Sequence, residues 1–146
     1  MEQQIIPLQH AAKALIRRKT DGKYLMLWSS VWEENPRRSQ QPDLPGGVVE
    51  SGETMHEGLC RELVEEIGLD VAGFETTLGY AFTYENDKTI SIFQCYLIVV
   101  DDDPEIKLSW EHEKYAWLTA EEVLALEIRQ PYPTIFESMA KTGLLV

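Results

Sequence analysis

Three glutamates, Glu62, Glu65 and Glu66, lie close together in the segment GGVVESGETMHEGLCRELVEEIGL, residues 46–69. On a helix, positions three and four apart are neighbours, so the three carboxylates are expected to project from one face. A carboxylate near the C-terminal end of a helix is unfavourable by a few tenths of a kcal/mol up to about 1 kcal/mol, because the backbone dipole is negative there. A bound cation would offset this cost, and a divalent ion held by carboxylates can neutralise and orient a phosphoanhydride.

Local signals mark both ends of the helix that carries these glutamates. Thr54 can cap its start together with Glu57 three residues later, which is the pattern of a capping box. Gly68 stands where a left-handed residue commonly ends a helix. The apolar residues that recur every four positions predict its buried side: Met55, Leu59, Leu63 and Ile67.

The rest of the chain reads as strands around this helix, followed by further helices. Strands are predicted over residues 11–18 and 24–28, joined by a tight turn, and over 71–83, 89–100 and 115–118. Helices are predicted over 120–128 and 133–146. The segment 89–100 is apolar enough to lie centrally in a sheet. The elements predict an α/β fold of the α+β type, with a mixed β-sheet sandwiched between α-helices.

Length and charge restrict the class of protein. A chain of 146 residues fits a single domain over residues 1–146. A formal net charge of −12 argues against binding of extended nucleic acid through a basic face. No apolar run approaches the roughly 20 residues that span a bilayer, and the first residues lack the pattern of a secretory signal. Cys60 and Cys95 are isolated, as in a reducing compartment, so we expect a cytoplasmic protein with no membrane partner.

The acidic helix belongs to a longer pattern. Gly47, Glu53, Arg61-Glu62-Leu63, Glu65-Glu66 and Gly68-Leu69 occupy every defining position of GX5EX7REUXEEXGU, in which U is a bulky aliphatic residue. This pattern resembles the Nudix box, and the chain is similar to the Nudix hydrolase family. The resemblance implies a Nudix fold and hydrolysis of a phosphoanhydride (pyrophosphate) bond in a nucleoside diphosphate linked to another moiety. A nucleoside triphosphate is one such substrate.

The resemblance also implies a cofactor and its ligands. Mg²⁺ is the expected ion, with Mn²⁺ as a substitute. Glu62 and Glu66 are the expected carboxylate ligands, Glu65 joins them or binds a second ion, and the backbone carbonyl of Gly46 is a further ligand. Either Glu62 or Glu65 would serve as general base towards the attacking water, and the sequence does not separate ligand from base.

Further catalytic residues follow from the same resemblance. Arg61 is expected to pair with Glu53 and with glutamates of its own helix, and so to orient the carboxylates. Family members often carry another acid late in the fold, shortly before an aromatic residue. In WEHEKYAW, Glu111 has the expected spacing as an additional ligand or base, and Glu113 is the alternative.

Substrate contacts are expected from a polar segment ahead of the box, SSVWEENPRRSQQPD, which reads as a long loop. Trp32, Arg37 and Arg38 suit base and phosphate recognition, whereas the alternative is a solvated loop with an anchoring tryptophan. Strand aromatics could also stack on a base, but such residues are more often core: Tyr80, Phe82, Tyr84 and Phe93.

Other functional readings are weaker. The acidic helix could be a solvated surface laced with Glu and Arg pairs, which is the common meaning of a charge run. A non-catalytic Nudix-fold module that senses a nucleotide or metabolite is the alternative function, although a sensor has no need of the full carboxylate set. A Nudix-fold isomerase has no support outside the box. The expected partner is a small nucleotide-like diphosphate, and a homodimer is left open.

Overall fold

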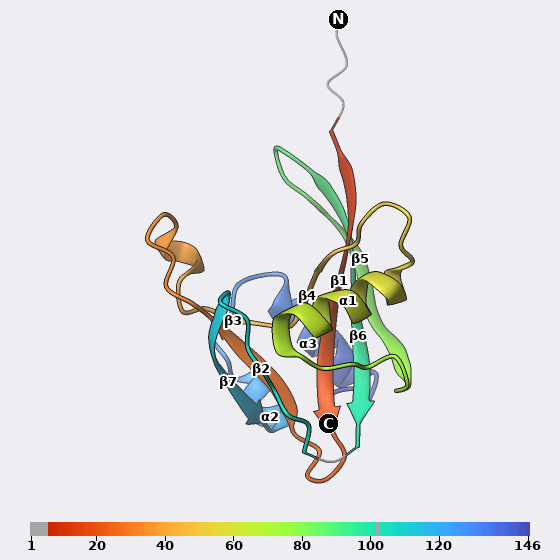
Figure 1. The fold of residues 1–146 in the computed structure, drawn as a ribbon. Helices are drawn as coiled ribbons and strands as arrows, with labels where there is room; N and C mark the ends of the chain where they lie inside the picture. The colour runs from red at the N-terminus through yellow and green to blue at the C-terminus, as the bar shows by residue number, and fades with distance from the viewer. Residues whose placement is uncertain (1–5, 102) are drawn as a thin grey trace, which may run out of the picture.

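A mixed β-sheet forms the centre of the molecule, with helices on both faces (Figure 1). The computed structural model describes residues 6–101 and 103–146, and the side chain of Arg38 lies outside this description. The strands are β1 (Leu8–Arg18), β2 (Tyr24–Ser29), β3 (Pro42–Asp43), β4 (Gly46–Val48), β5 (Thr76–Glu85), β6 (Ile90–Val100) and β7 (His112–Leu118). The helices are α1 (Met55–Ile67), α2 (Ala120–Leu124) and α3 (Tyr132–Lys141), with a short 3-10 helix, η1 (Pro36–Arg38). The predicted fold class is confirmed.

Strand β1 organises the sheet, whose main path runs β3-β2-β1-β6-β5. Along one edge β1 pairs in parallel with β6, from Leu8↔Ile90 to Arg18↔Val100, so the predicted central place of residues 89–100 is confirmed. Along its other edge β1 pairs antiparallel with β4 near Ala12 and with β2 at Arg17. The sheet therefore forks on this edge, with β4 on one branch and β2 with β3 on the other.

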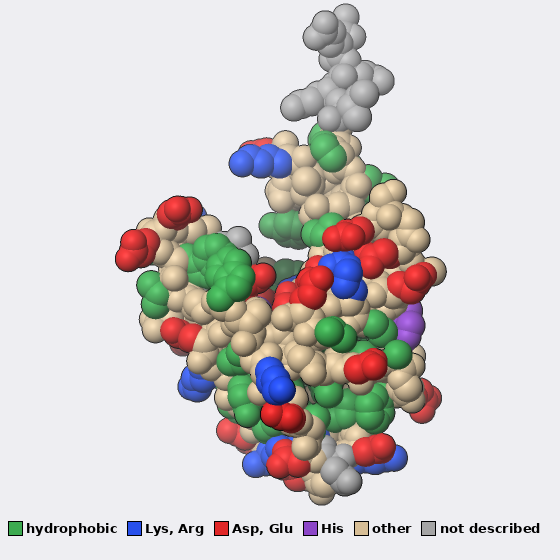
Figure 2. Space-filling view, in the orientation of Figure 1, with side chains coloured by type: hydrophobic (Ala, Val, Ile, Leu, Met, Phe, Trp, Pro, Cys, Tyr) green, Lys and Arg blue, Asp and Glu red, His purple; other side chains and the backbone are tan. Residues whose placement is uncertain are grey.

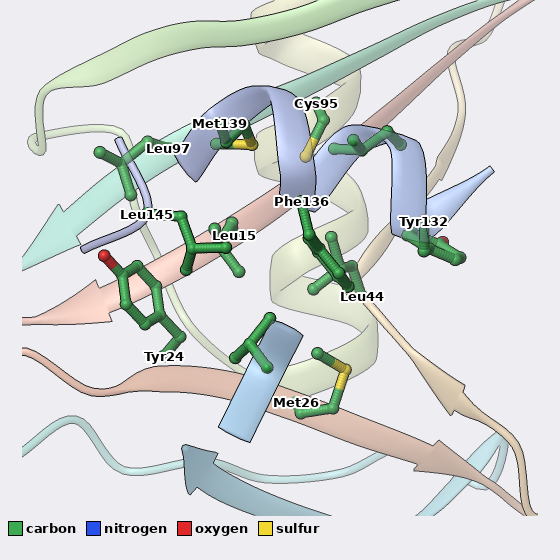
Figure 3. Packing of buried hydrophobic residues seen from close by; sticks show 12 residues of the cluster. Leu15, Tyr24, Met26, Leu44, Cys95, Leu97, Tyr132, Phe136, Met139 and Leu145 are labelled. Carbon is green, nitrogen blue, oxygen red and sulfur yellow. The ribbon is translucent and has the colours of Figure 1, made fainter. Parts of the chain in front are cut away.

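Two hydrophobic cores fill the spaces between the sheet and the helices. Because side chains alternate along a strand, Leu15 of β1 faces α3 while Ile16 faces α1. Figure 3 shows the core beneath α3, in which Leu15 and Cys95 of the sheet lie close to Phe136 and Met139 of the helix. The opposite core is formed by Leu59, Leu63 and Ile67 of α1. Helix α1 is thus anchored on one face, and its other side is free to serve the site.

Helix α1 begins and ends as the sequence predicts. The Thr54 hydroxyl accepts a hydrogen bond from the backbone N–H of Glu57 at 3.1 Å, and the Glu57 carboxylate accepts one from the N–H of Thr54 at 3.2 Å. Gly68 adopts a left-handed conformation with φ 67°, and its N–H reaches carbonyls of the last turn. The predicted stripe is buried at Leu59, Leu63 and Ile67, while Met55 is partly buried.

Three predicted boundaries are corrected by tertiary contacts. Strand β5 begins at Thr76 rather than at residue 71, because Asp70 and Phe74 close turns over the intervening residues. Helix α2 ends at Leu124 rather than at residue 128, because the next residues leave the helix and pack Leu126 and Ile128 against the core. Strand β7 begins at His112 rather than at residue 115, since its pairing with β2 extends to Ser29.

The C-terminal helix is also shorter than predicted. Helix α3 ends at Lys141, and the following residues turn back so that Leu145 is buried. The Tyr24 hydroxyl donates to the backbone carbonyl of Leu144 at 3.3 Å and accepts from the N–H of Val146 at 3.0 Å. These contacts favour a turn over continued helix.

Within residues 6–101 and 103–146, no helix is long and apolar enough to cross a membrane.

Candidate active site

A cleft of about 850 Å³ opens where the sheet forks. The space-filling view shows this hollow between the lobe that carries η1 and the hairpin of β5 and β6 (Figure 2). Its lining comes from segments that lie far apart in the sequence: Gln9, Ala11 and Lys13; Trp32 and Arg37; Asp43, Gly46 and Gly47; Glu62 and Glu66; Tyr84, Asn86 and Phe93; Glu111 and His112; Arg129 and Tyr132. Both acidic and basic side chains therefore face one space.

Two glycines allow the acids of α1 to reach this cleft past β4. Gly46 has φ 130°, and a Cβ atom on it would collide with the carbonyl oxygen of Ala12 on β1. A Cβ atom on Gly47 would lie 2.9 Å from the carboxyl carbon of Glu62. A side chain at either position would disturb the β1–β4 pairing or displace the carboxylate, which is the physical reason for glycine here.

Glu66 is a buried carboxylate, 6% exposed, at the base of the cleft. Its Oε2 accepts a hydrogen bond from the N–H of Gly46 at 3.0 Å. Burial raises the pKa of Glu66 to about 7, although the positive charge of Lys13 and the hydrogen bond from Gly46 act in the opposite direction. Ionised Glu66 is therefore costly until another positive charge approaches it.

Arg61 connects the remaining acids of the box. Its Nε donates to Glu53 Oε2 at 2.8 Å and its Nη2 to Glu53 Oε1 at 3.0 Å, which is a two-pronged contact. Its Nη1 lies 3.0 Å from Glu62 Oε1 and 3.5 Å from Glu65 Oε2. The hydrogen bonds from Arg61 and from the N–H of Glu50 lower the pKa of Glu53. The expected pairing of Arg61 with Glu53 is present. The same arginine also contacts the Glu62 carboxylate.

Lys13 connects the cleft floor to the glycine segment. Its Nζ donates to the carbonyl of Leu44 at 3.1 Å and to that of Gly46 at 3.2 Å. The same Nζ lies 3.6 Å from Asp43 Oδ1. Lys13 thereby sets the direction of the Gly46 carbonyl and places a positive charge near Glu66.

Asp43 joins the C-terminal segment to this floor. The Tyr132 hydroxyl donates to Asp43 Oδ1 at 2.6 Å, and Arg129 Nη2 lies 3.3 Å from the same oxygen. Burial alone would raise the pKa of Asp43, but the charges of Lys13 and Arg129 and the contacts from His112 and Tyr132 bring that pKa well below its usual range. Asp43 is therefore an ionised hub on which α3 is held against the cleft.

No sequence motif predicts the floor of the cleft, because its members stand singly in the chain. Two weak signals are present: Lys13 is a charged residue within the apolar stretch of residues 11–16, and Asp43 is an acid directly before Leu44-Pro45-Gly46-Gly47. Neither signal indicates which distant side chain the residue contacts.

The predicted acids are distributed unevenly around the cleft. Glu62, Glu66 and Glu111 line it, whereas Glu65 and Glu113 are not part of its lining. The Glu65 side chain is 61% exposed and lies beside Arg61. Among the loop residues, Trp32 and Arg37 line the cleft, and the side chain of Arg38 lies outside the described part of the structure.

The oxygen donors suit a divalent ion that shares its coordination with a substrate. Among the described residues, no group of three or more His, Cys, Asp or Glu side chains is gathered closely enough to hold a metal alone. Glu62, Glu66 and Gly46 nevertheless all line the cleft and contribute carboxylate and carbonyl oxygens to it. Mg²⁺ commonly binds through one or two carboxylates plus substrate phosphates and waters. The donor set thus fits such an ion.

Comparison with known proteins agrees with this geometry. Residues 7–139 match the family model described as NUDIX domain. The nucleoside triphosphatase NudI of Escherichia coli O139:H28 is 31% identical over 119 residues, covering 75% of this chain and 82% of that protein.

Solved structures share the fold over nearly the whole chain. The MutT protein of Methanosarcina mazei Go1 superposes with a TM-score of 0.81 at 27% identity and covers 97% of this chain and 99% of its own. An Ap4A hydrolase of C. elegans superposes with a TM-score of 0.72 at 20% identity, covering 92% and 97%. With Gly47, Glu62 and Glu66 of the box lining one cleft and a family match over most of its length, the chain belongs to the Nudix hydrolase family of enzymes.

Proposed function

We propose that this protein is a Mg²⁺-dependent hydrolase, with Mn²⁺ as a substitute, that cleaves a phosphoanhydride bond in a nucleoside diphosphate linked to another moiety. A nucleoside triphosphate is the first substrate to test, because the relative NudI is named a nucleoside triphosphatase. The observation that carries the proposal is that one cleft is lined by the acids Glu62 and Glu66 with Gly46, and also by the basic residues Lys13, Arg37 and Arg129. Acidic side chains that can bind a cation and basic side chains that can bind phosphates therefore line the same cleft.

In this proposal Glu62, Glu66 and the Gly46 carbonyl hold the ion. Nudix hydrolases generally use a divalent metal, and when bound it would neutralise phosphate charge and help to activate the attacking water. Lys13 orients the Gly46 carbonyl through its hydrogen bond of 3.2 Å. Glu65, 61% exposed, takes a supporting role beside Arg61 and remains the candidate ligand of a second ion.

The protein itself orients the reacting groups and handles the proton. The two-pronged contact with Glu53 fixes Arg61, and Arg61 in turn fixes the Glu62 carboxylate. Glu62 or Glu111 accepts the proton of the attacking water, since both face the cleft. If Glu62 accepts the proton, Glu111 is an additional ligand of the metal ion.

Substrate binding is assigned to the loop before the box. Arg37 and Arg38 would pair with phosphate oxygens, for which the guanidinium fork is suited, and Trp32 would contact the base. Residues 1–146 act as one domain in this proposal, and we place the protein in the cytoplasm with small nucleotide-like diphosphates as its partners.

The test is a hydrolysis panel in ¹⁸O-labelled water with Mg²⁺ or Mn²⁺. It would include nucleoside triphosphates, ADP-ribose, a nucleotide sugar and a dinucleoside polyphosphate, and product masses would identify the substrate and the phosphorus attacked. Glu62→Gln should lower kcat by roughly 10²–10³-fold, as loss of one charge-stabilising group does. Glu113→Gln is the matched control, since Glu113 is a nearby acid outside the cleft lining.

Two results would contradict the proposal. Glu62→Gln and Glu66→Gln variants that both retain wild-type rates would refute the site assignment. A ligand that stabilises the protein in a thermal-shift assay but stays uncleaved with Mg²⁺, while the whole panel also stays uncleaved, would favour the sensing module instead.

A further inference from the structure

Trp32, which is half-buried, and Trp110, which is exposed, pack against each other beside the cleft, and we call this pair the tryptophan platform. Trp32 lines the cleft, and Trp110 directly precedes Glu111, which also lines it. The ring centroids lie 5.3 Å apart with planes tilted by 48°. Trp110 is 74% exposed and Val31 is 60% exposed. Hydrophobic side chains gather on this side of the hollow (Figure 2). Exposed apolar surface of this kind beside a cleft marks a binding site.

The platform is held in place by the two segments that carry it. The Ser39 hydroxyl accepts from the N–H of Trp32 at 2.6 Å and donates to the carbonyl of Trp32 at 3.0 Å. The Ser30 hydroxyl donates to the carbonyl of Trp110 at 2.7 Å, and the N–H of Ser30 donates to the carbonyl of Glu111 at 2.8 Å. Both tryptophans are therefore fixed through their backbones before any ligand arrives.

The aromatic residues deeper in the cleft are used differently. Phe93 packs between Phe82, with ring centroids 5.1 Å apart, and Tyr132, with ring centroids 6.3 Å apart. Tyr132 is 2% exposed, and its hydroxyl is engaged by Asp43. This row continues through Phe136 into the core beneath α3. These rings pack against one another, whereas Trp110 is 74% exposed, more than Tyr84, which lines the cleft and is 48% exposed. Trp110 therefore offers a planar ligand the more accessible ring.

We propose that the tryptophan platform binds the nucleobase of the substrate by stacking, and that the enzyme therefore tolerates different bases. This inference rests on the proposed function, which places phosphates near Glu62 and Glu66, in the cleft that Arg37 and Trp32 also line. Stacking accepts any base because every base has a π-face. Ser30 and Ser39 hold the tryptophan backbones rather than reading base edges.

The kinetic test compares Trp110→Ala with Trp110→Phe. Tyr115→Ala is the control, because Tyr115 is an aromatic residue on β7, 41% exposed, that belongs neither to the cleft lining nor to the Trp32–Trp110 pair. Michaelis parameters would be measured for ATP, GTP, CTP and UTP, and for inorganic tripolyphosphate, which has no base. Trp110→Ala should raise KM for all four nucleotides by roughly 5- to 150-fold with little change in kcat, and Trp110→Phe should recover most of the loss. The ratio of kcat/KM for a nucleotide to kcat/KM for tripolyphosphate should fall by the same factor in Trp110→Ala.

A binding measurement separates this inference from the proposed function. The Kd of a non-hydrolysable ATP analogue, measured by isothermal titration calorimetry, should rise roughly 5- to 150-fold in Trp110→Ala, whether or not the protein hydrolyses any compound of the panel. If no compound is hydrolysed but Trp110→Ala raises this Kd and Tyr115→Ala does not, the proposed function fails and the platform stands. If the Kd and KM of Trp110→Ala match those of Tyr115→Ala, the platform is refuted. A wild-type dimer that Trp110→Ala dissociates, without a change in nucleotide affinity, would also refute it and assign the surface to a second copy of the chain.

Discussion

Replacing Glu66 by glutamine should make the metal-free protein more stable at neutral and alkaline pH while abolishing most of its activity. Glu66 is 6% exposed, and burial raises its pKa from the ordinary 4.5 to about 7. A folded-state pKa above the unfolded one means that the folded protein holds its proton to higher pH. The contribution of Glu66 to wild-type stability is therefore greatest below about pH 4.5 and is lost as pH rises through about 7.

The size of this effect follows from the shift. At about 1.4 kcal/mol per unit, a shift from 4.5 to about 7 corresponds to about 3 kcal/mol lost at pH 8 and about 1 kcal/mol lost at pH 5. Glutamine keeps an oxygen that can accept the hydrogen bond from the N–H of Gly46 but carries no charge. The gain in the free energy of unfolding of Glu66→Gln over wild type should thus grow by about 2 kcal/mol between pH 5 and pH 8.

The assay is urea unfolding at several pH values in the presence of a chelator, followed by circular dichroism. Glu65→Gln is the matched control. It removes the same charge at the neighbouring position, but the Glu65 side chain is 61% exposed. Added Mg²⁺ should stabilise wild type by mass action and so reduce the difference in the free energy of unfolding between Glu66→Gln and wild type. A Glu66→Gln variant whose advantage does not grow with pH, or grows no more than that of Glu65→Gln, would refute the reasoning.

Three further substitutions test how the site is held. Gly47→Ala should lower kcat while leaving the thermal midpoint near that of wild type, because its Cβ would lie 2.9 Å from the carboxyl carbon of Glu62 and that flexible side chain can move away; an unchanged kcat would contradict the close approach. Arg61→Lys should lower kcat by roughly 10- to 100-fold, since lysine cannot reproduce the two-pronged contact with Glu53; full activity would show that Glu62 needs no lateral support. Asp43→Asn should destabilise the fold by about 1–3 kcal/mol in urea unfolding, because the charges of Lys13 and Arg129 lose their shared partner; equal stability would show that Asp43 is not a hub.

The sequence by itself determined the parts of this protein that depend on neighbouring residues. Thr54, Glu57 and Gly68 act on backbone groups within one or two turns, so the ends of α1 could be predicted correctly. The box pattern likewise identified the family from a single segment. The end of α2 could not be predicted in the same way, because packing of Leu126 and Ile128 against a distant core overrides local helix preference.

Only the tertiary structure decided which residues share the cleft. Tyr132 meets Asp43 across 89 positions, and Ser30 meets Trp110 across 80. Adjacent residues of a helix point to different sides, but only the tertiary structure shows that the cleft lies on the side of Glu66 while Glu65 lies out beside Arg61. Residue types and local spacing carry no record of such pairings, because the contact energy between distant segments is realised only after the chain has closed the loops between them.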